Sequence, residues 1–287
     1  MPKLVRHAPD ELLSRCQAHL RAQFPESLVT RFILHNAPQS TCSQRVRFTL
    51  HAKGLAFDEI SLDLFSGDQL KPEYLAINPN GVVPTLVDNG TAIIDSSVIM
   101  EYLDEVFAEP VCFTPQDPIS RAQMRAIIQF INEVPTPAIR TPSYNLAFLP
   151  HFQAMSEREF MALAESKPLR KEFLLSMGRT GFPEKEMNIA LDRLNRAVER
   201  MNAHFTESGG PWLMGEMLTL ADIAVMPVIV RMDDINLHGA WADKPAIARW
   251  LEAFRAHPAF EPTFYKGTML TDKYPHLASL REARAAE

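Results

Sequence analysis

Apolar positions in the first third of the chain alternate between strand-like and helical spacing. Residues 28–35 are apolar and β-branched enough for a buried strand, and residues 42–53 have the spacing of a helix that Gly54 is placed to end. A second strand is predicted over 57–64, where apolar residues alternate. This strand–helix–strand order predicts a parallel pair joined by a right-handed crossover.

The next segment has the pattern of a hairpin. Two apolar runs, 82–87 and 91–94, flank the dipeptide Asn89-Gly90, which is a strong hairpin signal. Asp95 and Ser96 follow and are predicted to open a helix. These elements together predict a sheet of mixed parallel and antiparallel pairs with helices packed on it.

The rest of the chain is predicted to be helical. Three prolines over 109–118 are typical of a linker, and helical spacing dominates from Ile119 onward. Thr219 and Asp222 have capping-box spacing, which favours a structural role at a helix start. The predicted organisation has five parts: a helical extension (1–27), an α/β domain (28–108), a linker (109–118), an all-helical domain (119–270) and a tail (271–287).

Composition and charge mainly exclude classes of partner and site. The chain has 287 residues and a net charge of −6 without a long basic run, which argues against a nucleic-acid partner. No apolar stretch is long enough to span a bilayer, so no membrane association is expected. Three cysteines, Cys16, Cys42 and Cys112, argue against a disulfide scaffold and for a reducing, cytoplasmic compartment. No Cys/His cluster has zinc-ligand spacing, so no metal site is predicted.

Four segments, in this order, resemble the cytosolic glutathione-transferase family. They are S-T-C-S-Q-R-V-R (40–47), K-P-E-Y-L-A-I-N-P-N-G-V-V-P-T-L (71–86), D-S-S-V-I-M-E-Y-L (95–103) and T-L-A-D-I (219–223). The resemblance implies a thioredoxin-like, glutathione-binding domain followed by an all-helical substrate-binding domain. It also implies glutathione as co-substrate and a dimer, formed with itself or with a related chain.

A narrower resemblance lies in the helical domain. The segments M-S-E-R-E-F (155–160) and G-R-T-G-F-P-E-K-E-M (178–187) resemble the corresponding part of bacterial glutathione-dependent β-aryl etherases from lignin catabolism, and of related fungal transferases. The implied activity is attack of the glutathione thiolate on an electrophilic carbon of a hydrophobic aromatic substrate. In the etherase case the thiolate displaces an aryloxide from the carbon next to a ketone.

Such an enzyme must stabilise the thiolate of a thiol whose pKa is ordinarily roughly 8.5. Hydroxyl donors and free N–H groups at a helix N-terminus can do this, and Ser40, Thr41, Cys42 and Ser43 lie where the predicted strand passes into the helix. The resemblance implies that Ser40 activates glutathione, as in theta- and zeta-like members, or that Ser43 does, as in one etherase branch. The structural alternative for Ser40 and Thr41 is helix capping.

Cys42 leaves a second mechanism open. It matches a cysteine of zeta-like isomerases and of glutathione-dependent reductive dehalogenases, so a Cys42-dependent lyase or dehalogenase is an alternative. The structural alternative is that Cys42 is simply a small residue buried in the core. A further possibility is a transferase-like binding module without catalysis, because a fold does not imply a function.

The resemblance also implies contacts with glutathione. Val83-Pro84 resembles the cis-proline position, where the Val83 backbone would pair with the cysteinyl part of the tripeptide. Asp95 and Ser96 would bind the γ-glutamyl ammonium and carboxylate. Gln69 and Lys71 lie where the family contacts the glycyl end.

Candidate residues for the electrophile pocket, with ordinary helix packing as the alternative, are Phe130, Asn132, Arg140, Tyr144 and Phe148.

Overall fold

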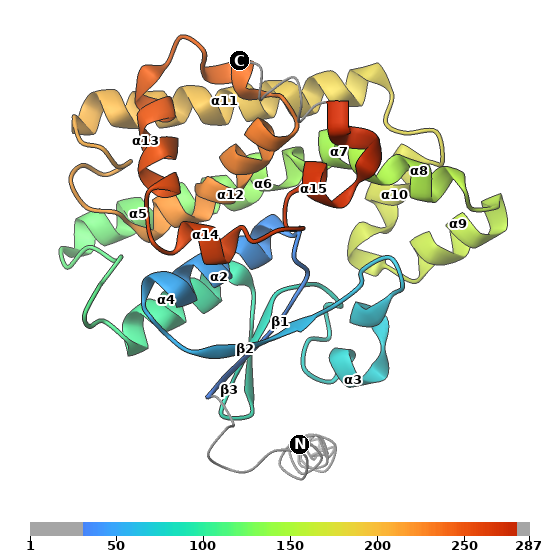
Figure 1. Cartoon of the computed structure of the whole chain (residues 1–287), viewed down its shortest axis with the longest axis horizontal. Coiled ribbons are helices and arrows are strands. Elements are labelled where there is room, and N and C mark those ends of the chain that lie inside the picture. The colour runs from blue at the N-terminus through green and yellow to red at the C-terminus, as the bar shows by residue number, and fades with distance from the viewer. Residues whose placement is uncertain (1–30, 280–287) are drawn as a thin grey trace, which may run out of the picture.

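The computed structural model describes residues 31–279 as a small sheet with helices, followed by a larger helical part (Figure 1). The extension predicted over 1–27 lies outside the described residues. The strands are β1 (Phe32–Asn36), β2 (Phe57–Ser61), β3 (Thr85–Asp88) and β4 (Thr91–Ile94). The helices of this first part are α2 (Thr41–Ala52), η2 (Asp68–Leu70), α3 (Pro72–Leu75) and α4 (Ser96–Val106).

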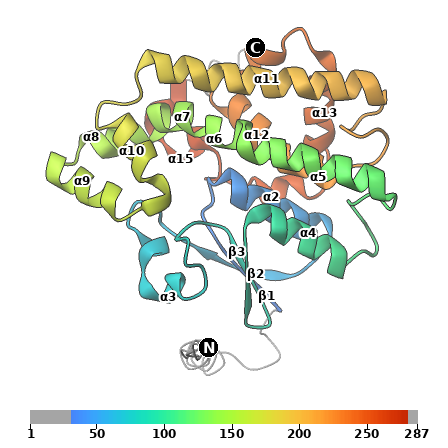
Figure 2. The same ribbon diagram turned by 180° about the vertical axis from the view of Figure 1, so that it is seen from behind.

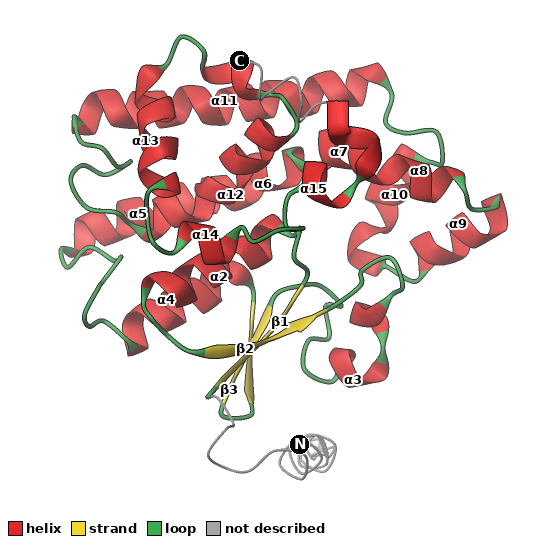
Figure 3. Ribbon diagram, viewed as in Figure 1, coloured by secondary structure: helices red, strands yellow, loops and turns green. Residues whose placement is uncertain are grey.

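The helical part begins after residues 107–117, which form no regular element. Figure 3 shows that strands are confined to the first part. The helices of the second part are α5 (Pro118–Glu133), α6 (Pro135–Ala138), α7 (Arg140–Ser143), η3 (Tyr144–Phe148), α8 (Leu149–Gln153), α9 (Glu157–Glu165), η4 (Pro168–Arg170), α10 (Lys171–Met177), α11 (Glu184–Ser208), α12 (Leu220–Asp234), η5 (His238–Trp241), α13 (Pro245–Arg255), α14 (Phe260–Thr263), α15 (Leu270–Lys273) and η6 (Pro275–Leu277).

The sheet has the order β2-β1-β3-β4, with β1 and β2 parallel and the other pairs antiparallel. The predicted mixed sheet is confirmed. Asn89 and Gly90 both adopt positive φ angles, of 46° and 87°, as the Asn-Gly turn requires. Strand β2 ends at Ser61, three residues before its predicted end, and as an edge strand it leaves Ile60 36% exposed.

One continuous hydrophobic core joins the sheet to the helical part. Helices α2 and α4 lie between the sheet and the helices above it (Figure 1), and α12 packs against both α2 and α5. Leu34 of β1, Val46 of α2 and Ile223 of α12 are fully buried in this core. In Figure 2 the long helix α11 follows the edge farthest from the sheet. The sheet and the helical part are therefore packed together through α2 and α12.

Helix α12 is the centre of this core. Thr219 and Asp222 form its capping box, as predicted, and Asp222 also accepts hydrogen bonds from the Leu213 backbone and the Trp250 indole, at 2.9 and 3.0 Å. Burial raises the pKa of Asp222. These contacts give the pair a structural role.

A second, smaller core lies beyond α5. Prolines at 135, 137, 142 and 150 divide the chain after α5 into short helices, because a proline has no N–H with which the preceding helix could continue. The apolar side chains that follow pack on one another rather than on the main core. We call this group the second core; its buried members are Phe152, Phe160, Ala164, Leu174, Met177 and Phe182.

The segment predicted as a tail from residue 271 continues the fold up to residue 279. Helix α15 and η6 pack on the main core through Leu270 and Leu277, which are 0% and 4% exposed. None of the helices within residues 31–279 combines the length and apolarity needed to cross a bilayer.

Candidate active site

The sheet topology brings three predicted site segments to one edge. β1 is antiparallel to β3, with His35 opposite Thr85, so the chain leaving β1 and the chain entering β3 lie at the same end of the sheet. β4 ends there too, because Thr85 pairs with Ile94. The N-terminus of α2, the segment before β3 and the start of α4 therefore lie at the same end of the sheet.

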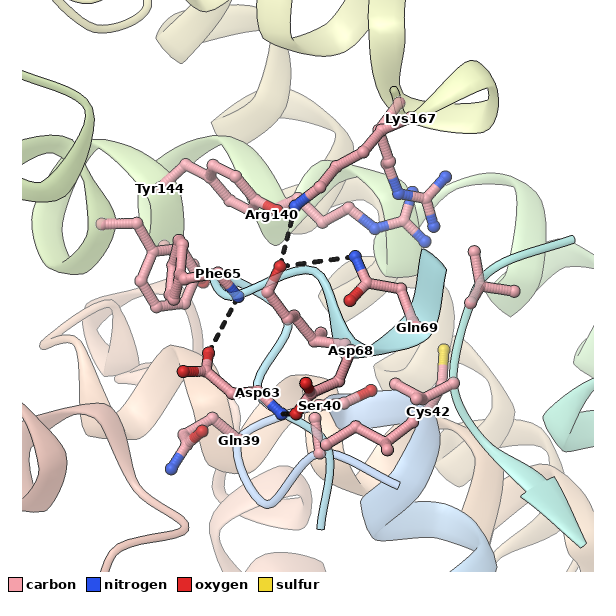
Figure 4. Close-up of a pocket in the computed structure, with 18 of the residues that line it drawn as sticks. Gln39, Ser40, Cys42, Asp63, Phe65, Asp68, Gln69, Arg140, Tyr144 and Lys167 are labelled. Carbon is pink, nitrogen blue, oxygen red and sulfur yellow. Dashed lines mark hydrogen bonds between the residues drawn. The ribbon is translucent and has the colours of Figure 1, made fainter. Parts of the chain in front are cut away.

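Ser40 caps α2 at this edge. Its Oγ accepts a hydrogen bond from the Ser43 backbone N–H at 3.3 Å, which confirms the capping role. Ser40, Thr41 and Cys42 all line a cavity, and Figure 4 shows the Cys42 sulfur directed into it. The Cys42 thiol is therefore not buried in the core.

Ser43 is buried away from the cavity. Its side chain is fully buried, its Oγ accepts a hydrogen bond from the Ala37 backbone N–H at 3.4 Å, and it is not among the residues that line the cavity. The Ser43 hydroxyl is thus directed toward the loop that follows β1 and not into the cavity. A catalytic role for Ser43 has no geometric support in this arrangement.

The cavity has a volume of about 730 Å³ and lies between the two parts of the chain. The N-terminus of α2 lines it on one side, and four aromatic side chains, Phe65, Tyr144, Phe148 and Phe152, line it on another. These rings contact one another; the centroids of Tyr144 and Phe148 are 4.8 Å apart and those of Phe65 and Phe148 are 5.2 Å apart. The cavity thus combines polar donors at a helix terminus with an aromatic wall.

Val83 and Gln69 also line the cavity. The Val83–Pro84 peptide bond is cis, as predicted. Gln69 is 4% exposed; its Nε2 donates to the Leu64 carbonyl at 3.3 Å, whereas its Oε1 is buried without a hydrogen-bond partner. An unsatisfied buried acceptor of this kind is suited to an N–H group of a ligand.

Lys71 points away from the cavity. Its side chain is 62% exposed and forms an ion pair with Asp68 at 2.7 Å, and it does not contribute to the lining. The pairing occurs because Lys71 follows η2, whose first turn carries Asp68.

Asp95 and Ser96 open α4 beside this cavity but do not line it. Asp95, at a φ of 71°, accepts hydrogen bonds from the backbone N–H groups of Ser97 and Val98 at 2.8 and 3.3 Å, so its capping role is confirmed. Ser96 is 6% exposed, and its Oγ lies 3.5 Å from Nη1 of Arg45. Contact of this pair with glutathione stays a prediction.

Arg45 organises a network that the sequence did not reveal. Its guanidinium is fully buried and donates to Asn132 Oδ1 at 2.8 Å and to Thr136 Oγ1 at 3.0 Å, while Asn132 donates to Ser97 Oγ at 2.8 Å. The network joins α2 and α4 to α5 and α6. The sequence feature that could have indicated this network is Arg45 itself, which follows Cys42 by three residues near the start of the predicted helix.

Two predicted pocket residues on α5 lie elsewhere. Asn132 is held in the Arg45 network, and Phe130 lies beneath the Arg200 guanidinium at 4.2 Å in a separate small crevice. Neither lines the 730 Å³ cavity. The pocket role expected for these two is thus corrected to interdomain bonding for Asn132, which contacts α2 and α4, and helix packing for Phe130, which contacts Arg200 of α11.

Arg140, Tyr144 and Phe148 do line the cavity, as do Arg231 and Lys273. Two more cationic side chains that the sequence did not indicate, Lys167 and Arg170, join them. Lys167 and Arg170 come from the η4 turn, and burial lowers the pKa of each. Burial also raises the pKa of Tyr144, so its hydroxyl stays protonated at neutral pH. Nothing in the local sequence marks these residues, because they are brought to the cavity by the second core.

Metal ligands do not gather in this region. Over residues 31–279, no three His, Cys, Asp or Glu side chains come close enough to hold a metal ion.

Comparison with known proteins identifies both halves of the chain. The model of the glutathione S-transferase N-terminal domain matches residues 39–106, and that of the C-terminal domain matches residues 157–253. Protein LigF of Sphingobium sp. strain SYK-6 is 28% identical over 225 residues, covering 76% of this chain and 87% of LigF. The crystal structure of the β-etherase LigF has a TM-score of 0.73 at 26% identity, covering 82% of this chain and 98% of that chain.

Two further proteins, an enzyme and a solved structure, are also similar to this chain. Maleylacetoacetate isomerase of Pseudomonas aeruginosa is 27% identical over 233 residues, covering 79% of this chain and 92% of the isomerase. The structure of Ure2p in complex with glutathione has a TM-score of 0.66 at 18% identity, covering 86% of this chain and 99% of that chain, and supports the fold alone.

Proposed function

Because this chain belongs to the glutathione S-transferase family, with glutathione as its co-substrate, we propose that it cleaves aromatic β-aryl ethers by thiolate attack. The thiolate of glutathione attacks the carbon that lies between an ether oxygen and a ketone. The carbon–oxygen bond breaks as the carbon–sulfur bond forms, and the electron pair leaves with the aryloxide. The products are a glutathione thioether and, after protonation, a phenol.

One observation carries the proposal: Ser40 presents a capping hydroxyl at the N-terminus of α2, on the wall of a cavity that also has an aromatic side. A hydroxyl donor and the positive end of a helix both favour a thiolate over a thiol. The rings of Tyr144 and Phe148 provide an apolar surface for an aromatic substrate. Holding both reactants in one cavity turns an encounter in solution into an aligned displacement.

Two features support the etherase reaction over a general transferase. LigF, a relative at 28% identity, is described as a β-etherase. The etherase-like segments 155–160 and 178–187 also flank the second core, which carries Phe152 of the aromatic wall. These segments therefore contribute to the shape of the aromatic side of the cavity, where the substrate would lie.

Product analysis tests the proposal directly. The full chain is incubated with glutathione and a panel of β-aryl ether ketones, halogenated aromatics and maleylacetoacetate-like cis-enones, and products are identified by mass spectrometry. We expect a glutathione thioether and an equimolar phenol from the ether ketones. If aryl halides react well and the ether ketones give no adduct, the protein is a general transferase.

The position of Cys42 supports a second candidate, a glutathione lyase. The Cys42 thiolate would attack the sulfur of a glutathione thioether, forming a Cys42–glutathione disulfide while the carbon fragment leaves with the electron pair and takes up a proton. A second glutathione would then release oxidised glutathione. Intact-protein mass spectrometry that traps a glutathione adduct, together with loss of turnover in Cys42→Ala, would establish this mechanism instead.

We also propose that the chain is a cytoplasmic dimer, with the sheet part of one subunit against the helical part of another. The support for this proposal is that members of the family usually dimerise in this way. Light scattering at micromolar concentration should give twice the mass of one chain; the mass of a single chain would contradict the proposal.

A further inference from the structure

Three cationic side chains line one part of the cavity. Arg140 comes from α7, and Lys167 and Arg170 come from the η4 turn. In the view of Figure 4, Arg140 and Lys167 lie on the side of the cavity opposite Ser40 and Gln39. Arg170 also lies close enough to Cys42 for their charges to interact, so the cluster extends from the far wall of the cavity toward the N-terminus of α2.

The acidic groups of the same cavity are already engaged. Asp63 accepts from the Phe65 and Ser66 backbone N–H groups and from the Ser66 hydroxyl, and its pKa is lowered by these contacts. Asp68 accepts from the Asp63 backbone N–H and pairs with Lys71. Asp68 is therefore paired with Lys71, and Asp63 acts on Lys167 only at longer range.

The cations themselves have few partners. Lys167 Nζ donates to the Leu64 carbonyl at 2.8 Å and faces Asp63 at longer range, and Arg170 Nη1 donates to the adjacent Leu169 carbonyl at 2.9 Å. In the part of the chain that the structure describes, no carboxylate lies within ion-pair distance of either residue or of Arg140. A guanidinium carries five N–H donors in a planar fork, so Arg140 and Arg170 keep several donors for a ligand.

The electrostatic state of the cluster favours an anion. Burial lowers the pKa of Arg170, and the neighbouring charge of Arg140 lowers it further. Partly buried like charges without a counter-ion are costly, and a bound carboxylate would remove both the repulsion and part of the desolvation. Arginines stay protonated at neutral pH, so the cluster is permanently cationic.

We propose that the electrophile of this enzyme carries a carboxylate on its aromatic portion, held by Arg140 and Arg170. The proposal rests on the proposed function, and it narrows the substrate class to aromatic acids. The ring lies against Tyr144 and Phe148, and the carboxylate extends from it to the guanidinium pair. The glycyl end of glutathione is the other source of a carboxylate in this cavity, and the experiment separates the two.

Calorimetry with three ligands tests the proposal without requiring turnover. The ligands are glutathione, S-phenacylglutathione and S-(4-carboxyphenacyl)glutathione; the last two are thioethers that the proposed displacement would form. In the unmodified protein the carboxylated thioether should bind about tenfold or more tightly than the phenacyl thioether, because it gains charge-assisted hydrogen bonds. Raising the salt concentration should reduce this preference only partly, since the pair is half-buried.

Two variants locate the effect. Arg140→Gln and Arg170→Gln should each lower the preference for the carboxylated thioether to near unity while leaving the dissociation constant of S-phenacylglutathione within about twofold. The control is Arg193→Gln, which removes a cation from the exposed face of α11 and should leave all three constants unchanged.

The outcomes are distinct. Equal affinity of the two thioethers for the unmodified protein overturns the inference while leaving the proposed function intact. If the variants weaken glutathione itself as much as the carboxylated thioether, the guanidinium pair holds the glycyl carboxylate and the inference is again wrong. If none of the three ligands binds, the proposed function fails together with the inference.

Discussion

Replacing Ser40 by alanine separates two functions of one hydroxyl. As the N-cap of α2 it accepts from the Ser43 backbone N–H at 3.3 Å, and losing a cap of this kind costs about 1 kcal/mol of stability. As a donor to the thiolate, its loss should raise the reaction barrier by about 1–3 kcal/mol, which slows turnover roughly ten- to a hundredfold or more. The two effects differ enough to be told apart.

The loss of the cap cannot by itself reduce the rate tenfold. A domain with about 5 kcal/mol of stability that loses about 1 kcal/mol is still more than about 99% folded. A large fall in kcat/KM for Ser40→Ala would therefore report on chemistry rather than on folding. The pH profile should change as well, since weaker thiolate stabilisation moves the rising limb of the rate to higher pH.

The assay compares kcat/KM against pH at saturating glutathione, together with thermal unfolding. Ser40→Thr keeps a hydroxyl and should retain most of the activity. Asp117→Ala removes the N-cap of α5, where the side chain accepts from the Ser120 backbone N–H at 2.7 Å, and should lower stability without slowing turnover. If Ser40→Ala loses only the stability that Asp117→Ala loses, Ser40 is a cap and the mechanistic reasoning is wrong.

Three further predictions test binding, acid stability and packing. Calorimetry on Ser96→Ala should show glutathione binding weakened about ten- to a hundredfold, because the γ-glutamyl carboxylate loses a charge-assisted hydrogen bond; unchanged affinity would remove Ser96 from the site. Burial lowers the pKa of His35 to about 4, whereas a histidine of the unfolded chain has a pKa of about 6.5. Between pH 6.5 and pH 4 the unfolded chain is therefore protonated at this residue and the native chain is not. The free energy of unfolding should therefore fall by about 2 kcal/mol between pH 7 and pH 5, and urea titrations of His35→Gln should show a smaller fall. A Cβ at Gly210 would lie 2.3 Å from the Gly215 backbone, so Gly210→Ala should lower the stability by roughly 1–3 kcal/mol, whereas Gly239→Ala, with nothing within 4 Å, should not; equal unfolding curves would contradict this.

The sequence was most informative where structure is local. The Asn89-Gly90 turn and the capping box of Thr219 and Asp222 were predicted and are present, because each depends on a few adjacent residues. The end of β2 was harder to predict from the sequence. Alternation of apolar residues continues to Leu64, but pairing with β1 stops at Ser61, where β1 itself ends. Strand length is set by the partner, and the partner is distant in the sequence.

The site was predictable on its sheet side and less so on its helical side. Ser40, Cys42 and Val83 line the cavity because short loops fix them to strand ends. Phe130 was misplaced because the rotation of α5 depends on its packing against α12, which is distant in the sequence. Lys167 was missed because only tertiary packing of the second core brings its turn to the cavity.

The separateness of the second core has an evolutionary consequence. Leu174 and Met177 are buried among neighbours of their own, so changes there are absorbed locally, while Ile223 and the main core keep α2 and the sheet edge in place. Sequence drift around the cavity wall can thus alter which electrophiles are accepted without endangering the fold or the thiol-activating helix. We therefore expect substitutions in the second core to change substrate preference more than they change the stability of the main core.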